Sequence, residues 1–509
     1  MAGDHFLGVI LKLECLHVRF RYFGALFEFK GTHGGAGGGL ATHHSGELKY
    51  STNIRHYHYI SNRYRSDYTP FFRIQVIFSL IGYQLYLHKG FDETPNYVTS
   101  EKCQACHQDA YDNWRDNTLH PYMFLPVDSP DAKILGDFDS EDPAVTFTRN
   151  DIDFVLGSKW EQVYVTHIDG ENYPLPAKWY VQQKRWVPYK VDSWKQTPLS
   201  YKCDGCHTTG FDPTTRQFAE YGIGCEACHG GGSVHIQNQE RNSKWQCTVC
   251  HTEDATHPHQ ADIISSVSPS VCGQCHNRGK NIVLDSQKTG EFNFPLGFKP
   301  GDDLSKSFKQ NAPKEDKKGQ YWWGNGVSKN RHQEFADWSQ SKHAQALSKL
   351  LEYGAGTERG ALTADCLKCH SSDYRHSSGE QKRTLDSARF GIACIDCHEP
   401  HGRRLHEHSA NTGTDQCAGC HIHNLSHSSA VSGKPHIPCP INQVSCADCH
   451  MPRIVKTGGY YSLRSHAFKI IKPTMSQESD IPNSCQNGGC HANRDLEWAI
   501  EAYKQHYVD

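Results

Sequence analysis

Four short segments decide how this chain is read: CDGCH at residues 203–207, CEACH at 225–229, CTVCH at 247–251 and CGQCH at 272–276. Each has the pattern CXXCH, in which two thiols form thioethers to the vinyl groups of a porphyrin and the adjacent histidine ligates the iron. Two residues between the cysteines match the distance between the vinyl groups. The histidine that follows then lies under the metal, so the pattern predicts covalently attached c-type haem.

The same pattern occurs five more times, and a longer version closes the series. With 22 Cys and 34 His in 509 residues, chance would give roughly 0.06 copies, so nine copies are not accidental. The tenth site, CQNGGCH at 485–491, has four residues between its cysteines. We expect haem there as well, with a disulfide or a bare loop as the alternatives.

We number the motifs 1 to 10 in chain order and predict ten haems. The cysteines expected to carry them are Cys103, Cys106, Cys203, Cys206, Cys225, Cys228, Cys247, Cys250, Cys272, Cys275, Cys366, Cys369, Cys394, Cys397, Cys417, Cys420, Cys446, Cys449, Cys485 and Cys490. The expected proximal ligands are His107, His207, His229, His251, His276, His370, His398, His421, His450 and His491.

The composition also favours haem over an ordinary hydrophobic core. Only 37% of residues are hydrophobic, and the mean hydropathy is -0.68, values that would otherwise suggest a loop-rich or partly disordered chain. The motifs leave about 39 residues for each haem. We therefore expect the haems to form the core, with little room for a separate core of side chains.

The sequence also argues against two other functions, zinc binding and nucleic-acid binding. Paired thiolates at this spacing also bind zinc, but a zinc site does not need a histidine fixed after every second cysteine. The formal net charge is -3, and the chain has no long basic run, so nucleic acid is not an expected partner.

Residues 1–88 differ from the rest because they contain no motif. Residues 71–87 are mostly apolar and follow Arg55, Arg63 and Arg65, an order that resembles an export signal placed unusually far from Met1. We expect an export signal absent from the mature protein. A membrane anchor, although 17 residues are short of the roughly 20 needed to span a bilayer, and an ordinary folded segment are the alternatives. Because c-type haem is attached outside the cytoplasmic membrane, we predict a periplasmic or extracellular protein, with membrane association only through this segment.

Local patterns predict a mainly α fold with extensive loops. Short helices are expected at 111–120, 334–351 and 494–508. Residues 155–190 alternate loosely around Asp169-Gly170, which predicts a small β-hairpin insertion with His167 as a surface histidine.

An internal repeat organises the motifs. The first cysteines of motifs 2 to 5 recur in motifs 6 to 9 at offsets of 163, 169, 170 and 174, which indicates a duplicated tetrahaem unit with one extra haem at each end. YGIGC at 221–225 matches FGIAC at 390–394, and Trp114 with His120 precedes one set as Trp338 with His343 precedes the other. The predicted divisions are a leader at 1–88, an N-terminal pentahaem half at 89–300, a linker at 301–333 and a C-terminal pentahaem half at 334–509.

The motif array, the run CEACHGGGSVH at 225–235, and residues 446–452 with RSH at 464–466 resemble multihaem c-type cytochromes. The similarity is to the superfamily of the nitrifier tetrahaem cytochrome and the octahaem hydroxylamine-oxidoreductase-like proteins, over about residues 100–500. The resemblance implies a multihaem cytochrome c fold, with haems in parallel and perpendicular pairs and two histidines on most irons.

The sixth ligand of each iron is therefore expected to be histidine. Methionine would raise the potential, but only Met123, Met451 and Met475 follow residue 88. The strongest distal candidates are His120, His235, His343, His401, His436 and His466. A weaker group comprises His257, His259, His332, His376, His406, His408, His423 and His427.

These observations predict an exported decahaem cytochrome that carries electrons through low-potential haems, without a catalytic side chain. Its partners would be other redox proteins, met through small interfaces. One alternative is a reductase in which an open haem site acts on nitrite, hydroxylamine or a sulfur oxyanion. Another is a subunit that self-assembles through haem-exposing edges into an extracellular filament.

Overall fold

The computed structural model describes residues 96–244, 268–283, 292–353, 361–402, 417–421, 445–487 and 490–506. Nearly all of them belong to one compact unit, formed by residues 95–236 and 261–509. The predicted leader, motif 4 and His436 lie outside the described residues. Within the described ranges, no helix is both long enough and apolar enough to cross a membrane.

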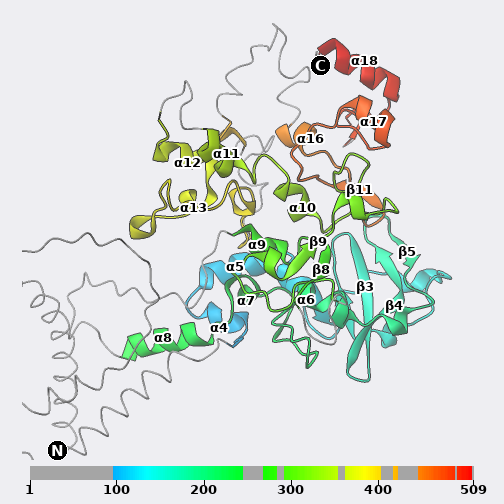
Figure 1. Ribbon diagram of the computed structural model, residues 1–509. Helices are drawn as coiled ribbons and strands as arrows, with labels where there is room; N and C mark the ends of the chain where they lie inside the picture. The colour runs from blue at the N-terminus through cyan, green and yellow to red at the C-terminus, as the bar shows by residue number, and fades with distance from the viewer. Residues whose placement is uncertain are drawn as a thin grey trace, which may run out of the picture. The chain divides into compact units, whose positions relative to one another are not determined.

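The helices are short, and most of them carry or flank a motif (Figure 1). The α-helices are α4 (Ser100–Gln104), α5 (Gln108–Asn117), α6 (Asp204–His207), α7 (Cys225–His229), α8 (Ser233–Lys244), α9 (Pro269–Gly273), α10 (Glu334–Ser339), α11 (Ala346–Tyr353), α12 (Leu367–His370), α13 (Ser372–Arg375), α16 (Cys446–His450), α17 (Pro473–Ser479) and α18 (Leu496–His506). Single 3-10 turns include η1 (His120–Tyr122), η2 (Phe138–Ser140), η3 (Arg149–Asp151), η4 (Trp194–Gln196), η5 (Leu199–Tyr201), η7 (Leu304–Lys306), η8 (Pro313–Glu315), η9 (Ala364–Cys366), η10 (Gly379–Gln381) and η11 (Cys394–Asp396).

Two of the three expected helices are confirmed, as α5 followed by η1 and as α18. The third was expected as one helix over 334–351. That prediction is wrong, because the segment forms two helices, α10 and α11, with a break between them. The backbone carbonyl of His343, inside the break, accepts the N–H of Ile392 at 2.9 Å. That carbonyl is therefore turned toward a distant segment and does not continue a helix.

The β-structure is larger than the predicted hairpin. Strands β1 (Phe124–Pro126), β2 (Phe154–Leu156), β3 (Glu161–Ile168), β4 (Glu171–Tyr180) and β5 (Arg185–Pro188) form one antiparallel sheet in chain order. The predicted hairpin is its centre: β3 and β4 are joined by Asp169 and Gly170, both with positive φ. Positive φ at both turn residues suits the twist of the flanking strands.

Side chains form a core of their own on the sheet, so the expectation that the chain lacks one is wrong here. Tyr164, Trp179 and Trp186 are buried together with Leu175 and Ile152. The Nε1–H of Trp186 donates to the carbonyl of Asp137 at 2.8 Å, so the buried indole has a partner. A second cluster, around Phe124 and Val165, also packs on the sheet.

The segment expected to be a linker, residues 301–333, packs against the C-terminal part of the chain. Trp323 and Val327 are buried with Ile454, Ile471 and Ile481. The Nε1–H of Trp323 donates to the carbonyl of Ile454 at 3.2 Å. The remaining strands form two-stranded pairs: β6 (Thr208–Thr209) with β7 (Glu220–Tyr221), β8 (Gly279–Asn281) with β9 (Phe308–Gln310), and β10 (Val455–Thr457) with β11 (Tyr460–Leu463).

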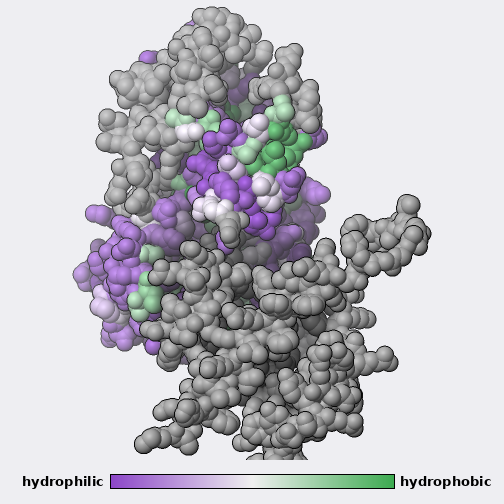
Figure 2. Space-filling model, turned by 90° about the vertical axis from the view of Figure 1, so that its left-hand side faces the viewer, coloured by the Kyte–Doolittle hydropathy of each residue, from purple (hydrophilic) through white to green (hydrophobic). Residues whose placement is uncertain are grey.

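The described surface is mostly hydrophilic on the face that Figure 2 shows, with small apolar patches. This agrees with a chain of low mean hydropathy. The large hydrophobic side chains that stay exposed come from separate elements: Tyr97, Val191, Tyr221, Ile282, Val283, Leu351, Tyr460 and Tyr461.

Candidate haem-binding sites

The motifs share one local conformation. In motif 1 the carbonyl of Cys103 accepts the N–H groups of Cys106 and His107, at 3.2 and 2.9 Å. The corresponding bonds occur in motifs 2, 5, 7 and 8. A single helical turn of this kind gathers both thiols and the histidine at one end of the segment, as two thioethers and an axial ligand require.

Five motif histidines face a second histidine ring at nearly the same separation. The pairs, with the distance between ring centroids, are His107 and His235 (6.3 Å), His207 and His332 (6.5 Å), His229 and His401 (6.0 Å), His398 and His466 (6.1 Å), and His421 and His343 (6.1 Å). In each pair one histidine belongs to a motif and the other does not.

That separation fits two imidazoles on opposite sides of one metal ion. Metal–nitrogen bonds of about 2.0 Å on each side, with the ring radius added twice, place the ring centroids about 6 Å apart. Direct contact between stacked rings would bring them closer, to about 4.5 Å. The five pairs therefore have the spacing of a bis-histidine haem iron.

The charge state of the buried histidines also suits ligation. Burial lowers the pKa of His207 to about 4, and burial followed by repulsion from His466 does the same for His398. A neutral imidazole is the form that binds a metal. The Nδ1 atoms of His207 and His343 are buried without a hydrogen-bond partner among the described residues.

His120 lies near the histidine of motif 5. Its pKa is lowered to about 4, first by burial and then by repulsion from His276, the proximal histidine of that motif. On the other side, Glu334 places Oε2 3.8 Å from Nδ1 of His276. Burial would raise the pKa of Glu334, but attraction to His276 outweighs burial and lowers the value to about 2. A carboxylate behind a ligating histidine fixes the ring and raises its basicity.

The two histidines that follow Trp114 and Trp338 are held in the same way. The indole Nε1–H of Trp114 donates to the carbonyl of Ile223 at 3.1 Å, and the N–H of Ile223 donates to the carbonyl of His120 at 2.9 Å. In the second set, Trp338 donates to the carbonyl of Ile392 at 2.7 Å, and the N–H of Ile392 donates to His343 at 2.9 Å. We call each arrangement a tryptophan latch.

A second matched contact joins consecutive motifs. Thr209, two residues after the histidine of motif 2, accepts the N–H of Gly224, just before motif 3, at 2.8 Å. Ser372, two residues after the histidine of motif 6, accepts the N–H of Ala393, just before motif 7, at 2.6 Å. The same hydroxyl position therefore sets the spacing between motifs in both halves.

The structure brings most of the predicted distal histidines to a motif. His235, His343, His401 and His466 each face a motif histidine, and His120 interacts with His276. His332, placed in the weaker group because it follows the expected linker, faces His207. His376 instead lies 3.3 Å from the carboxylate of Asp396. His167 is an exposed strand residue bonded to Asn172, as predicted.

Motifs 6 and 10 have different surroundings. Nδ1 of His370 lies 3.2 Å from the carbonyl of Ala346. His491 packs on Trp498 of α18, with 4.8 Å between ring centroids. No disulfide joins cysteines within the described ranges.

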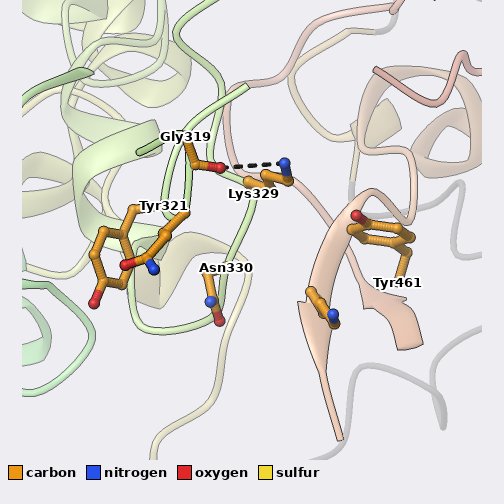
Figure 3. Close-up of a pocket in the computed structure, with 7 residues that line it drawn as sticks. Gly319, Tyr321, Lys329, Asn330 and Tyr461 are labelled. Atoms are coloured by element: carbon orange, nitrogen blue, oxygen red, sulfur yellow. Dashed lines mark hydrogen bonds between the residues drawn. The ribbon is translucent and has the colours of Figure 1, made fainter. Parts of the chain in front are cut away.

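A surface pocket of about 420 Å³ lies apart from the motif residues. Its lining includes Tyr321, Lys329 and Asn330 from one segment and Lys456 and Tyr461 from the β10–β11 hairpin (Figure 3). The ammonium of Lys329 is already bonded to the carbonyl of Gly319 at 3.2 Å. The pocket contains no histidine or cysteine, so it is not a haem site. Among the described residues, no group of three or more His, Cys, Asp or Glu side chains forms a separate metal site.

Comparisons with known proteins find similarity to cytochromes. Residues 180–230 and 329–399 match the family described as cytochrome c554 and c-prime. The solved structure of the outer cell wall cytochrome OcwA is similar with a TM-score of 0.63 and 25% identity, over 80% of this chain and 86% of that one. An undecahaem cytochrome from the S-layer of Carboxydothermus ferrireducens gives a TM-score of 0.44 and 18% identity, over 83% of this chain and 62% of that one. A search of curated proteins gives no match.

The two family segments cover motifs 2 and 3 and motifs 6 and 7, the places where the hydroxyl contacts recur. OcwA is an outer cell wall cytochrome, which agrees with the predicted extracellular location of this chain. With its repeated CXXCH motifs, paired histidines and the family match over these segments, the chain is similar to the multihaem c-type cytochromes.

Proposed function

We propose that this protein is a decahaem electron carrier at the cell surface, in which most irons have two histidine ligands. The five histidine pairs at 6.0–6.5 Å carry the proposal. Haem iron supplies the redox chemistry when bound, and the protein sets the ligands, the burial and the spacing of the haems. Two imidazoles give a lower potential than a histidine–methionine pair.

We also propose that motifs 2 to 5 and motifs 6 to 9 are the two copies of a duplicated tetrahaem unit, as the repeat in the sequence indicates. The two tryptophan latches and the two hydroxyl contacts support it, because each joins equivalent positions of the two halves. The extra motifs 1 and 10 would then extend the haem chain at its two ends. Other redox proteins are the proposed partners there.

The first test is an electron paramagnetic resonance (EPR) spectrum of the air-oxidised protein, with the haem content measured on the same sample. Ten haems per chain, nearly all low-spin, is the expected result. A high-spin signal from about one haem in ten would instead support the reductase alternative. Fibres in the electron microscope, with low-spin iron only in the assembled form, would favour the filament alternative.

One pair of variants tests the ligand assignment residue by residue. His332→Ala removes a buried ring that faces His207 and should convert one low-spin haem to high-spin. His167→Ala removes an exposed strand histidine and should leave the spectrum unchanged. Unchanged spin states in both variants would contradict the assignment of His332.

A further inference from the structure

If electrons pass from haem to haem, as proposed, the contacts between motifs decide which haems exchange them. Motif 5 is in contact with motif 2 through sulfur. Sγ of Cys206 lies 3.7 Å from the carbonyl oxygen of Gln274, the residue before Cys275. Cys206 would carry a thioether, so this contact would place an edge of the motif 2 haem beside motif 5.

Motif 5 also contacts motif 3. The side-chain amide of Gln274 donates to the carbonyl of Ala227 at 3.0 Å, so a residue between the cysteines of one motif bonds a residue between the cysteines of the other.

The third neighbour of motif 5 comes from the C-terminal half. Helix α9, which includes Cys272, packs against turn η11, which begins motif 7 at Cys394. Motif 5 therefore meets motifs 2 and 3 of the N-terminal half and motif 7 of the C-terminal half.

The other described motifs are connected differently. Helix α4, which includes Cys103 of motif 1, packs against helix α7 of motif 3. The guanidinium of Arg375, five residues after motif 6, donates to Sγ of Cys420 of motif 8 at 3.1 Å. Among these contacts of the described residues, motif 1 reaches motif 3, and motif 8 reaches a segment of its own C-terminal half.

We propose that the haem of motif 5 is the junction at which the two halves exchange electrons, and that Glu334 is the positioning residue that keeps its potential low. The junction rests on the proposed electron-transfer function. The carboxylate faces Nδ1 of His276, so it makes the ligand more basic and favours ferric iron. With its potential kept low in this way, the junction haem would hold an electron only briefly and would pass it to a flanking haem.

Electrostatic interaction between neighbouring haems offers a test of the proposed junction. His120→Met should raise the potential of the motif 5 haem, because thioether ligation favours the ferrous state. This haem would then be reduced early, and its added negative charge would lower the midpoint potentials of its neighbours. We expect three other haems to shift downward in a potentiometric titration followed by EPR.

His235→Met is the matched control at motif 1. The same ligand change is made there, but motif 1 contacts motif 3 alone among the described motifs, so one other haem should shift. Equal numbers of shifted haems in the two variants would overturn the junction. This failure is distinct from failure of the electron-carrier proposal, which the spin state and haem count of the unaltered protein decide.

Glu334→Gln gives a second, milder route to the same haem. It keeps every ligand and removes one charge, so it should raise one midpoint potential and shift the same three neighbours downward by a smaller amount. Glu315→Gln, which alters an exposed carboxylate paired with Lys309, should change none of them. Unchanged potentials in Glu334→Gln would overturn the role of Glu334, even if His120→Met does not fold.

Discussion

In the sheet of β1–β5, aromatic side chains fill the space between the strands and the loops around them, whereas hydrogen bonds between short turns join the motifs. Tyr164, Trp179 and Trp186 pack together in the sheet. Between motifs, one hydroxyl such as Thr209 or Ser372 spans the gap. Burial of large aromatic side chains stabilises a fold far more than isolated hydrogen bonds do.

This difference indicates that the sheet and the motif region have different sources of stability. The sheet has the side-chain core of an ordinary small domain and should keep its structure through packing alone. The motif region has many buried polar groups and few apolar clusters, so its stability should depend on the attached haems. Substitutions in each region should therefore separate packing energy from haem ligation.

The largest effect should come from Trp186→Ala. The indole is buried among aromatic rings and donates to the carbonyl of Asp137, so its loss should cost about 3–5 kcal/mol of unfolding free energy. Urea unfolding followed by tryptophan fluorescence measures the loss. Haem content and EPR should stay as in the parent, and Val191→Ala, at an exposed position, should change neither. Loss of haem in Trp186→Ala would show that the regions fold as one.

A charge pair fixes the sheet to the segment before α10. Glu161 on β3 forms ion pairs with Lys178 at 3.0 Å and with Arg331. Burial would raise the pKa of Glu161, but Arg331 and Lys178 outweigh it, and the pKa is lowered. Because the native pKa is lowered, this stabilisation is present above the ordinary glutamate pKa and is lost as pH falls through the lowered value.

Glu161→Gln should therefore cost about 2–3 kcal/mol at neutral pH, since it leaves two partly buried cations without their carboxylate. The difference from the parent should shrink as the pH falls below about 4. Unfolding curves at several pH values measure it. Asp131→Asn, which breaks the more exposed pair with Arg115, should cost less than about 1 kcal/mol. A difference for Glu161→Gln that grows in acid would contradict the assigned pKa shift.

The sequence predicted those features that depend on neighbours along the chain. The haem motifs have fixed spacing, and Asp169-Gly170 marks its hairpin by local backbone preference. The pairing of Trp114 and His120 with Trp338 and His343 was visible because the same local order recurs in the two halves, and both latches are present in the structure.

Features that depend on distant segments were harder to predict. Strands β1 and β2 are three residues each and pair Phe124 with Leu156, too short for an alternating pattern. His332 follows a charged, Pro- and Gly-containing stretch that reads as a linker, yet it faces His207, 125 positions earlier. Which histidine reaches which iron is set by chain crossings, and a single sequence contains no periodic signal for those.

A backbone contact in the first latch should have a smaller effect than the charge pair. Gly222 has φ of 71°, and a Cβ there would lie 2.4 Å from the carbonyl oxygen of Pro121, next to His120. Gly222→Ala should cost about 2 kcal/mol and alter one EPR signal, because His120 must move. Gly230→Ala is the control, with φ of 87° and open space at its Cβ. Its cost, about 1 kcal/mol, measures the backbone strain alone; equal costs would mean that the contact with Pro121 is unimportant.

The smallest effect should come from the latch indoles, and it compares the two halves directly. Trp338→Phe and Trp114→Phe each leave an isoleucine carbonyl without its donor, so each should cost about 1 kcal/mol, as judged by urea unfolding of the holoprotein. The latches share no residue, so the double variant should cost the sum within about 0.5 kcal/mol. A much larger loss would show that the halves do not act separately. If only one of the two single variants lost stability, the two latches would share a geometry, but only one of them would stabilise the protein.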